Sequence, residues 1–298
     1  MFNMPIKPLL SATIIMALLA AVPAFAGTPE RVVSLGPIIT ETIYMIGANN
    51  RLIADTTYCN VPADARSKIK IGSVIQVDVE KIVSLKPDLV LASALARKRQ
   101  LELMEKLGLR VIQFNNPETF AEMCDMTRRI GQLMGKPAAA RRITENARQA
   151  VDAIISRTAD LPRPKVFMQI GLKPLHTSPR GTFTSEYIEF AGGINIAGGV
   201  GSGNYSRENV LRENPDIILI ATMGSSKSGA LKEKETWMSY STLKAARNNR
   251  IHILDPEAVC SPTPVSFAET LKEIVTLIHP DLSDPDLSNL MQMQACGP

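Results

Sequence analysis

An internal repeat constrains this chain more than any other feature. Residues 80–91 and 208–219 share one pattern, in which a Glu opens a short helix, a Pro-Asp turn lies seven residues further on and an apolar strand follows. The two opening residues are Glu80 and Glu208. A helix that leads through a turn into an apolar strand is the unit from which parallel α/β sheets are built. Two copies of it predict two lobes of similar construction.

A long helical pattern separates the two copies. Apolar residues recur at helical spacing through residues 137–160, and two prolines end the pattern before a new strand at residues 165–170. A helical connector is stiff, which limits closure of the lobes by a hinge. The alternative is one continuous domain in which this is one more helix. The expected N-terminal lobe, connecting helix and C-terminal lobe are residues 27–136, 137–161 and 162–298.

Strands and helices alternate on both sides of this helix. In the first half, strands are expected at residues 31–35, 52–55, 89–92 and 110–114, with helices between them. The alternation predicts an α/β fold of two Rossmann-like lobes with parallel sheets. Ligands of such sheets bind outside the carboxyl ends of the strands, so the cleft between the lobes is the expected site.

The first 26 residues have the layout of a secretory signal peptide. Lys7 precedes an almost wholly apolar run at residues 9–22, and a small-x-small motif ends at Ala26. The apolar run is short for a bilayer span, although an uncleaved membrane anchor is the alternative. The residue directly after the expected cleavage site at Ala26 is Gly27 and not the Cys that a lipoprotein requires, which argues against a lipoprotein. We expect a periplasmic protein.

Composition and motifs argue against several classes of function. The formal net charge is only +4 and the basic residues are scattered, so nucleic-acid binding is not indicated. The three histidines, His176, His252 and His279, share no metal-binding spacing. Nucleophile-elbow, phosphate-loop and dinucleotide motifs are absent from the sequence. We expect no catalytic residues and no catalytic cofactor, with a periplasmic enzyme such as a chelatase as the alternative.

Four residues could bind a metal near the expected cleft: Cys59, Met223 and Cys260, which offer soft sulfur ligands, and His176, which offers an imidazole. The two cysteines fall in loops of different lobes. Three interpretations of them stay open, namely two unrelated thiols, a disulfide across the mouth of the cleft, or thiolate contact with a bound metal centre. Cys124 lies in a helical pattern and is expected to be a small buried apolar residue.

Several segments resemble one known family. The strand at residues 31–35, the helix that contains Thr40 and Glu41, the first copy of the repeat and the long central helix resemble periplasmic binding proteins with a rigid helical backbone. These proteins serve ABC importers of cobalamin, haem and ferric siderophores. Residues 167–174, 192–196 and 206–208 are most similar to the vitamin B12-binding branch.

The resemblance implies a partner for the two repeated glutamates. In that family one Glu on each lobe docks onto Arg residues of the membrane permease, and Glu80 and Glu208 match these positions. An exposed acid at each helix start can form charge-assisted pairs with Arg. The alternative is that each Glu only favours its own helix N-terminus. The implied partner is a permease dimer with its cytoplasmic ATPase, served by a monomer of this chain.

The resemblance also implies a ligand, which is a corrinoid or another metal chelate held between the lobes. Tyr58 matches a tyrosine that packs on the corrin ring, whereas the loop with Ile75 and Gln76 lacks the expected Trp. Tyr205 is expected to face the cleft from the second lobe and to stack on a macrocycle. The alternatives are haem, a ferric siderophore or a free metal on Cys59 and Cys260. The expected ligand-binding residues are Pro37, Tyr58, Cys59, Ile75, Gln76, Gly171, Tyr205, Met223 and Cys260.

Overall fold

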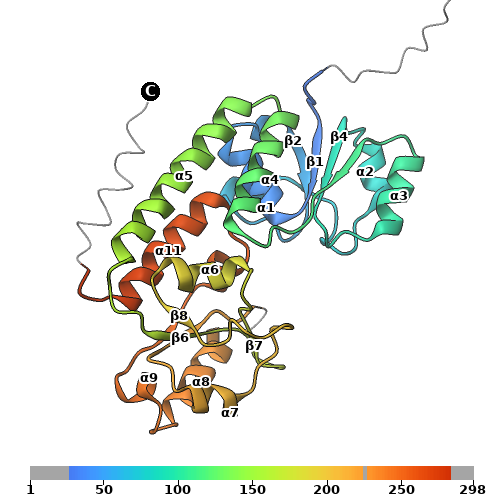
Figure 1. The fold of residues 1–298 in the computed structure, drawn as a ribbon. Helices are drawn as coiled ribbons and strands as arrows, with labels where there is room; N and C mark the ends of the chain where they lie inside the picture. Colours follow the sequence, from blue (N-terminus) through green and yellow to red (C-terminus); the bar gives the residue numbers. More distant parts are fainter. Residues whose placement is uncertain (1–26, 224–226, 283–298) are drawn as a thin grey trace, which may run out of the picture.

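The computed structural model describes residues 27–223 and 227–282. The expected signal peptide lies outside this part of the chain, as does the C-terminal segment that contains Cys296. Two sheets form two lobes, and Figure 1 shows them at opposite ends of the long helix α5 (Pro137–Thr158). The α/β fold with two lobes and a long connecting helix is therefore confirmed.

The N-terminal sheet is wholly parallel, in the strand order β3-β2-β1-β4-β5. Its central strands are continuous apolar runs with every residue of β1 and β4 buried, as expected for a parallel sheet covered on both faces. The strands are β1 (Val32–Leu35), β2 (Leu52–Asp55), β3 (Ile69–Lys70), β4 (Leu89–Ala92) and β5 (Val111–Gln113).

Alternate side chains of β1 enter two separate cores. Val32 packs with α1 and α4 on one face of the sheet, and Val33 packs with α2 and α3 on the other. This division follows from the two-residue period of a strand. The helices of this lobe are α1 (Pro37–Met45), α2 (Val79–Ser84), α3 (Lys98–Lys106) and α4 (Phe120–Leu133), with short 3-10 turns at Asn49–Arg51 and Ala63–Ser67.

The C-terminal sheet has the order β10-β9-β6-β7, and β8 pairs with the start of β6. One strand departs from the expected parallel arrangement. β7 is antiparallel to β6, because a short turn joins the two and a parallel strand would need a long crossover. The strands are β6 (Lys165–Gly171), β7 (His176–Thr177), β8 (Ile194–Asn195), β9 (Ile217–Ile220) and β10 (Ile251–Ile253).

Helices cover both faces of this second sheet. Phe167 of β6 packs on the buried Trp237, and Met168 faces the opposite cluster with Tyr187 and Phe267. The helices are α6 (Phe183–Phe190), α7 (Arg207–Glu213), α8 (Lys227–Met238), α9 (Lys244–Arg247), α10 (Pro256–Cys260) and α11 (Pro264–Ile278).

Three helices, α4, α5 and α11, form the layer that joins the lobes. They pack pairwise against one another, and Figure 1 shows α11 beside α5. Phe267 of α11 stacks between Phe120 of α4 at 4.8 Å and Tyr187 of α6 at 4.3 Å between ring centroids. Cys124 of α4 is fully buried in the same cluster, as expected. The covalent connection is α5, but side chains from both lobes fill the layer beside it.

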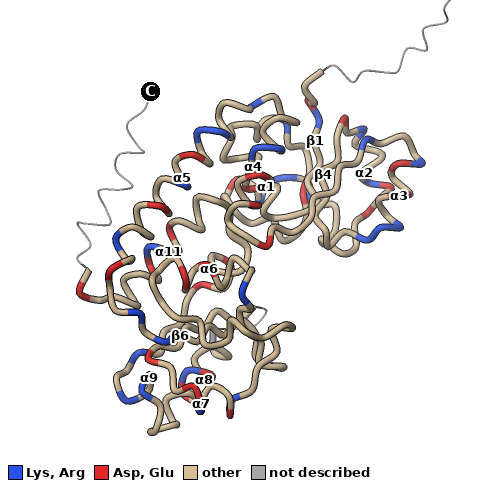
Figure 2. The backbone as a smooth tube through the Cα atoms, viewed as in Figure 1, with Lys and Arg blue, Asp and Glu red and all other residues tan. Residues whose placement is uncertain are grey.

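The surface of the molecule is mixed in charge. Figure 2 shows basic and acidic residues interspersed along α5 and over both lobes. Within residues 27–223 and 227–282, no helix has the length and apolar character needed to cross a membrane.

Candidate ligand-binding site

Hydrogen bonds join the two lobes at the carboxyl ends of their strands. The Thr263 hydroxyl, at the start of α11, donates to Oε1 of Glu41 on α1 at 3.3 Å. The backbone N–H of Phe120 donates to Oε2 of Glu186 at 2.7 Å. Since α1 follows β1 and α11 follows β10, the carboxyl-end loops of both sheets lie at the same junction. This is where ligands of open α/β sheets bind.

Four large apolar side chains are exposed in the loops that follow strand ends. Tyr58 follows β2 and is 62% exposed, Ile75 follows β3 at 52%, Leu95 follows β4 at 57% and Met223 follows β9 at 60%. Where such side chains form one contiguous patch, the patch marks a ligand-binding or interaction site. Leu95 was not among the residues expected from the sequence. The sequence feature that could have identified Leu95 is its place just after the apolar strand β4, since Met223 lies in the same place after β9.

A tight turn presents Ile75 and Gln76. Ser73 donates its backbone N–H to the carbonyl of Gln76 at 2.9 Å. Gly72 begins the turn with φ +98, and a Cβ at this position would lie 2.5 Å from the Gln76 carbonyl oxygen. Only glycine fits this conformation without strain. The turn replaces the Trp expected from the family pattern with one exposed Ile and one exposed Gln.

Pro37 and Gly171 occupy matching places at the ends of the first strand in each lobe. Pro37 is the first residue of α1, directly after β1 and the extended Gly36. Gly171 is the last residue of β6, and a Cβ there would lie 2.8 Å from the Cβ of His176. Both residues therefore lie at the carboxyl end of the first strand of their lobe.

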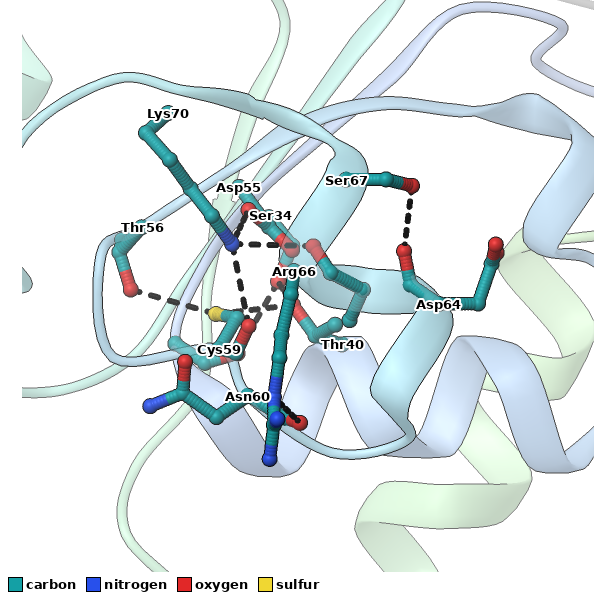
Figure 3. A network of polar contacts seen from close by, with 12 residues as sticks. Ser34, Thr40, Asp55, Thr56, Cys59, Asn60, Asp64, Arg66, Ser67 and Lys70 are labelled. Atoms are coloured by element: carbon teal, nitrogen blue, oxygen red, sulfur yellow. Dashed lines mark hydrogen bonds and ion pairs between the residues drawn. The ribbon is translucent and has the colours of Figure 1, made fainter.

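The thiol of Cys59 is buried beneath the site. Its side chain is fully buried, and Sγ lies 3.2 Å from the hydroxyls of both Thr40 and Thr56 (Figure 3). Burial raises the pKa of this thiol, and the two hydroxyls oppose the shift. Contact between Cys59 and a ligand stays a prediction. In this geometry the thiol points into the lobe, while its neighbour Tyr58 is exposed.

Lys70 holds the loop that carries Tyr58. Its Nζ donates to Oδ1 of Asp55 at 2.7 Å and to the carbonyl oxygens of Cys59 and Ala65 at 3.0 Å each (Figure 3). Asp55 is fully buried. Desolvation raises the pKa of its carboxyl, although the ammonium of Lys70 acts in the opposite direction. The ammonium thus ties the end of β2 to the loop at two points.

Cys260 lies at the end of α10 and is half-buried, with its Sγ donating to the carbonyl of Ala221 at 3.6 Å. Burial raises the pKa of this thiol to about 12. Cys59, Cys124 and Cys260 are all free thiols. The interpretation as a disulfide between Cys59 and Cys260 is therefore wrong, because one thiol is enclosed in its own lobe.

Two of the four candidate metal ligands, His176 and Cys59, lie in different lobes. His176 of β7 has its Nδ1 3.2 Å from Oδ1 of Asn204, and Cys59 is enclosed in the other lobe. Over the described part of the chain, no group of three His, Cys, Asp or Glu side chains is arranged to hold a metal ion. Met223 is the one of the four that is strongly exposed at a strand end.

Tyr205 lies against the core of its lobe. Its ring stacks on Phe167 with centroids 5.7 Å apart, and its hydroxyl donates to the carbonyl of Ile196 at 3.4 Å. Phe167 covers one face of the ring, so stacking of Tyr205 on a macrocycle stays a prediction for the other face. Phe167 and Trp237 belong to one apolar cluster on that side of the sheet, and Tyr205 packs against it.

Both copies of the repeat have the same local structure. Glu80 and Glu208 are exposed in the first turns of α2 and α7. Asp78 and Ser206 cap the two helices by accepting a backbone N–H three residues on. The pKa of the Glu208 carboxyl is lowered, mainly by its hydrogen bond with its own backbone N–H and by the Ser206 hydroxyl. Each glutamate therefore presents a solvent-exposed carboxylate on its lobe.

The Pro-Asp turn of the repeat has a structural role in both lobes. Asp88 accepts the backbone N–H of Arg31 at 2.9 Å, at the start of β1. Asp216 accepts the backbone N–H of Lys165 at 2.8 Å, at the start of β6. The residues before the two prolines, at positions 86 and 214, have φ angles of 48 and 49. The repeat thus specifies one helix–turn–strand geometry, built twice.

These features define a class of two-lobed α/β binding proteins with a helical connecting layer. The chain matches the periplasmic binding protein family over residues 32–258 and belongs to that family, whose members act as substrate-binding components of ABC transporters. They work with a permease and an ATPase.

Three comparisons locate the chain within the family. A vitamin B12-binding protein from Yersinia pestis is 31% identical over 71% of this chain and 75% of its own length. The periplasmic vitamin B12-binding protein of Vibrio cholerae superposes with a TM-score of 0.70 at 25% identity, over 84% of this chain and 97% of that one. A periplasmic haem-binding protein from Pseudomonas aeruginosa gives a TM-score of 0.73 at 22% identity, over 86% and 96%, and shares the fold.

Proposed function

We propose that this chain is the periplasmic solute-binding component of an ABC importer and that it captures a corrinoid or another metal chelate between its lobes. The observation that carries the ligand class is the set of exposed apolar side chains at strand ends, Tyr58, Ile75, Leu95 and Met223. They come from both lobes and would cover the two faces of a flat, largely apolar ligand. The similarity to vitamin B12-binding proteins supports this choice.

Titration with a panel of chelates tests the proposed ligand. The panel contains cobalamin, cobinamide, haem and a ferric siderophore, with isothermal calorimetry as the measurement. We expect one-to-one binding of a corrinoid without turnover. A Leu95→Ser variant should weaken that binding, since Leu95 presents apolar surface to the site, whereas Leu103→Ser, at a 45% exposed position on α3, should not. Absence of binding to every compound contradicts the proposed ligand class.

Haem or a ferric siderophore is the second candidate within the same fold. The resemblance of the fold to a haem-binding protein favours it. The calorimetric panel separates the two, because a haem-binding protein would prefer haem over both corrinoids. The protein purified from its native host provides an independent measurement, since corrins, haem and ferric chelates differ in absorption spectrum.

The free-metal hypothesis, in which Cys59 and Cys260 bind the ion, has less geometric support. The thiol of Cys59 is enclosed beside two hydroxyls, and Cys260 is half-buried in the other lobe. We propose no catalytic residues and no catalytic cofactor, in line with the transport role of the relatives. Formation of a product from any bound chelate would contradict this.

Delivery to the permease is assigned to Glu80 and Glu208. The two carboxylates are exposed at equivalent positions of the two lobes, on short helices with the same cap geometry. Such a pair suits two Arg clusters on a two-fold symmetric permease, because each lobe then meets one permease subunit. We propose that a monomer of this chain, secreted after cleavage at Ala26, makes this contact in the periplasm.

A further inference from the structure

A buried polar network connects α7, the helix that carries the proposed docking residue Glu208, to the carboxyl end of β6 near the proposed ligand site. We call α7 the docking helix. Nη2 of Arg207, the first residue of α7, donates to Oε1 of Glu233 on α8 at 2.5 Å. The same Oε1 accepts Nε2 of Gln169 on β6 at 2.9 Å. Nε2 of Gln169 also donates to the carbonyl oxygen of Gly171 at 3.1 Å. Hydrogen bonds therefore run without a break from α7 to the end of β6.

The middle of the network is sealed from solvent. Gln169 and Trp237 are fully buried and Glu233 is 8% exposed. The indole Nε1 of Trp237 donates to Oε1 of Gln169 at 2.7 Å, and the guanidinium carbon of Arg207 lies 4.5 Å from the indole centroid. In this low-dielectric setting each bond constrains its neighbours strongly, because a displaced group has no water to replace its lost partner.

Both ends of the network reach a surface with an assigned role. At one end, Arg207 is followed directly by Glu208, the proposed docking residue on the same first turn. At the other, the main chain of β6 holds the segment before Met223: the Ala221 N–H donates to the Gln169 carbonyl at 2.8 Å and the Met223 N–H to the Ile170 carbonyl at 3.3 Å. Movement of the Met223 segment therefore pulls directly on the strand that carries Gln169.

The guanidinium of Arg207 has a spare donor. Its Nη1 is buried, and among the described residues it has no hydrogen-bond acceptor. Arg207 can therefore take a new acceptor without first breaking its bond to Glu233. A group with this property can stabilise two arrangements of α7, as a coupling element requires.

We propose that the Arg207–Glu233–Gln169 network couples occupancy of the ligand site to the position of the docking helix α7. The proposal rests on the proposed function, and it assigns to these three residues a positioning role in recognition of the loaded protein by the permease. Reciprocity follows from thermodynamic linkage: a ligand that shifts α7 must itself be bound more weakly or more tightly when α7 is perturbed.

The chain contains one tryptophan, so ¹⁵N labelling gives a single indole resonance, from the Trp237 N–H within the network. The first arm uses no ligand and compares the amide resonance of Gly171 in the native protein, Arg207→Lys and Glu235→Gln. Glu235 is the matched control because it is exposed on the same helix as Glu233. We expect Arg207→Lys to shift the Gly171 resonance and Glu235→Gln to leave it unchanged. An unmoved Gly171 resonance in Arg207→Lys overturns the coupling whether or not any ligand binds.

The second arm adds a ligand that calorimetry has shown to bind. We expect the indole resonance of the native protein to move to a new position in step with saturation. Glu233→Gln should reduce this movement and change the affinity by about 5-fold or more, the usual lower range for coupled sites, with Glu235→Gln at native affinity. Binding heat with an unmoved indole resonance overturns the inference while the proposed function stands. If no compound of the calorimetric panel binds, only the proposed ligand class is contradicted, and the first arm alone decides the coupling.

Discussion

The hydroxyl of Thr263 donates a hydrogen bond to Oε1 of Glu41 and so joins two helices from different lobes. Glu186 makes a second such link through the backbone N–H of Phe120. Burial raises the pKa of both carboxyls, with smaller contributions from nearby acids, namely Glu269 for Glu41 and Glu189 and Glu122 for Glu186. The junction between the lobes therefore contains two carboxyls that lose part of their hydration on folding.

These two carboxyls should make the stability of the protein depend on pH. A carboxyl with a raised folded-state pKa contributes most to stability below its ordinary pKa of 4.5, and this contribution is lost as the pH rises through the raised value. In the Glu41→Gln/Glu186→Gln double variant this loss is absent, because the amide stays neutral and can still accept the same hydrogen bonds. We expect the free energy of unfolding of the variant minus that of the native protein to be larger, meaning a relatively more stable variant, at pH 7 than at pH 4.

Urea unfolding at both pH values provides the measurement for this prediction. Glu105→Gln, at an exposed position on α3, is the control for loss of one acidic residue. An equal difference between the double variant and the native protein at the two pH values would contradict it.

The aromatic stack of the connecting layer should be a major contributor to stability. Phe267 is fully buried between Phe120 and Tyr187. Truncation by Phe267→Ala should lower the free energy of unfolding by about 3–5 kcal/mol, through lost burial and the cavity left behind. Val265→Ala on the same helix, at a position 37% exposed, should cost less than about 0.5 kcal/mol. Equal effects of the two substitutions in urea unfolding would show that the layer is not packed as described.

Lys70 should be essential for the loop that presents Tyr58. Lys70→Met leaves the buried carboxylate of Asp55 without its cation, which should cost about 3–5 kcal/mol in the free energy of unfolding. The added substitution Asp55→Asn removes the uncompensated charge and should restore part of that stability. The control is Lys106→Met, at an exposed position on α3. If urea unfolding shows that Lys70→Met lowers the free energy of unfolding no more than the control does, the Lys70–Asp55 pair contributes little to stability.

The two exposed glutamates should be needed for delivery and not for capture. We expect Glu80→Gln/Glu208→Gln to keep native ligand affinity in calorimetry and to lose stimulation of the permease ATPase in proteoliposomes, because the amides cannot form charge-assisted pairs with Arg. Glu102→Gln, at an exposed position on α3, is the matched control. Native ATPase stimulation by the double variant would remove both residues from the docking surface.

The cysteines should be dispensable for ligand binding. Burial raises the pKa of the thiols of Cys59 and Cys260, so both should react slowly with a thiol reagent until the protein is unfolded. Cys59→Ser/Cys260→Ser should keep its affinity for the best-binding chelate to within a few fold. Loss of binding in this double variant would favour the free-metal hypothesis over capture of a chelate.

Much of the architecture follows from local patterns in the chain. The buried strands β1 and β4 are continuous apolar runs, and Pro137 begins the connecting helix as its spacing predicted. The repeat was visible because each copy specifies its own cap, turn and strand within a dozen residues. Asp88 and Asp216 then form the same contact in both lobes, each with the first strand of its sheet. Periodicity and turn chemistry act over short distances, so a single sequence reveals them.

The sequence by itself thus determined the two α/β lobes, the helix between them and the exposed glutamates at matching helix starts. Only the tertiary structure decided which side chains of the strand-end loops are exposed and which are buried. Tyr58 and Cys59 are neighbours in the sequence, yet the first is 62% exposed and the second fully buried, because Lys70 and two threonine hydroxyls fix the loop around the thiol. Tyr205 stacks on Phe167, and Leu95 is exposed in the loop after β4. These outcomes depend on packing between segments far apart in the chain, which no local pattern records.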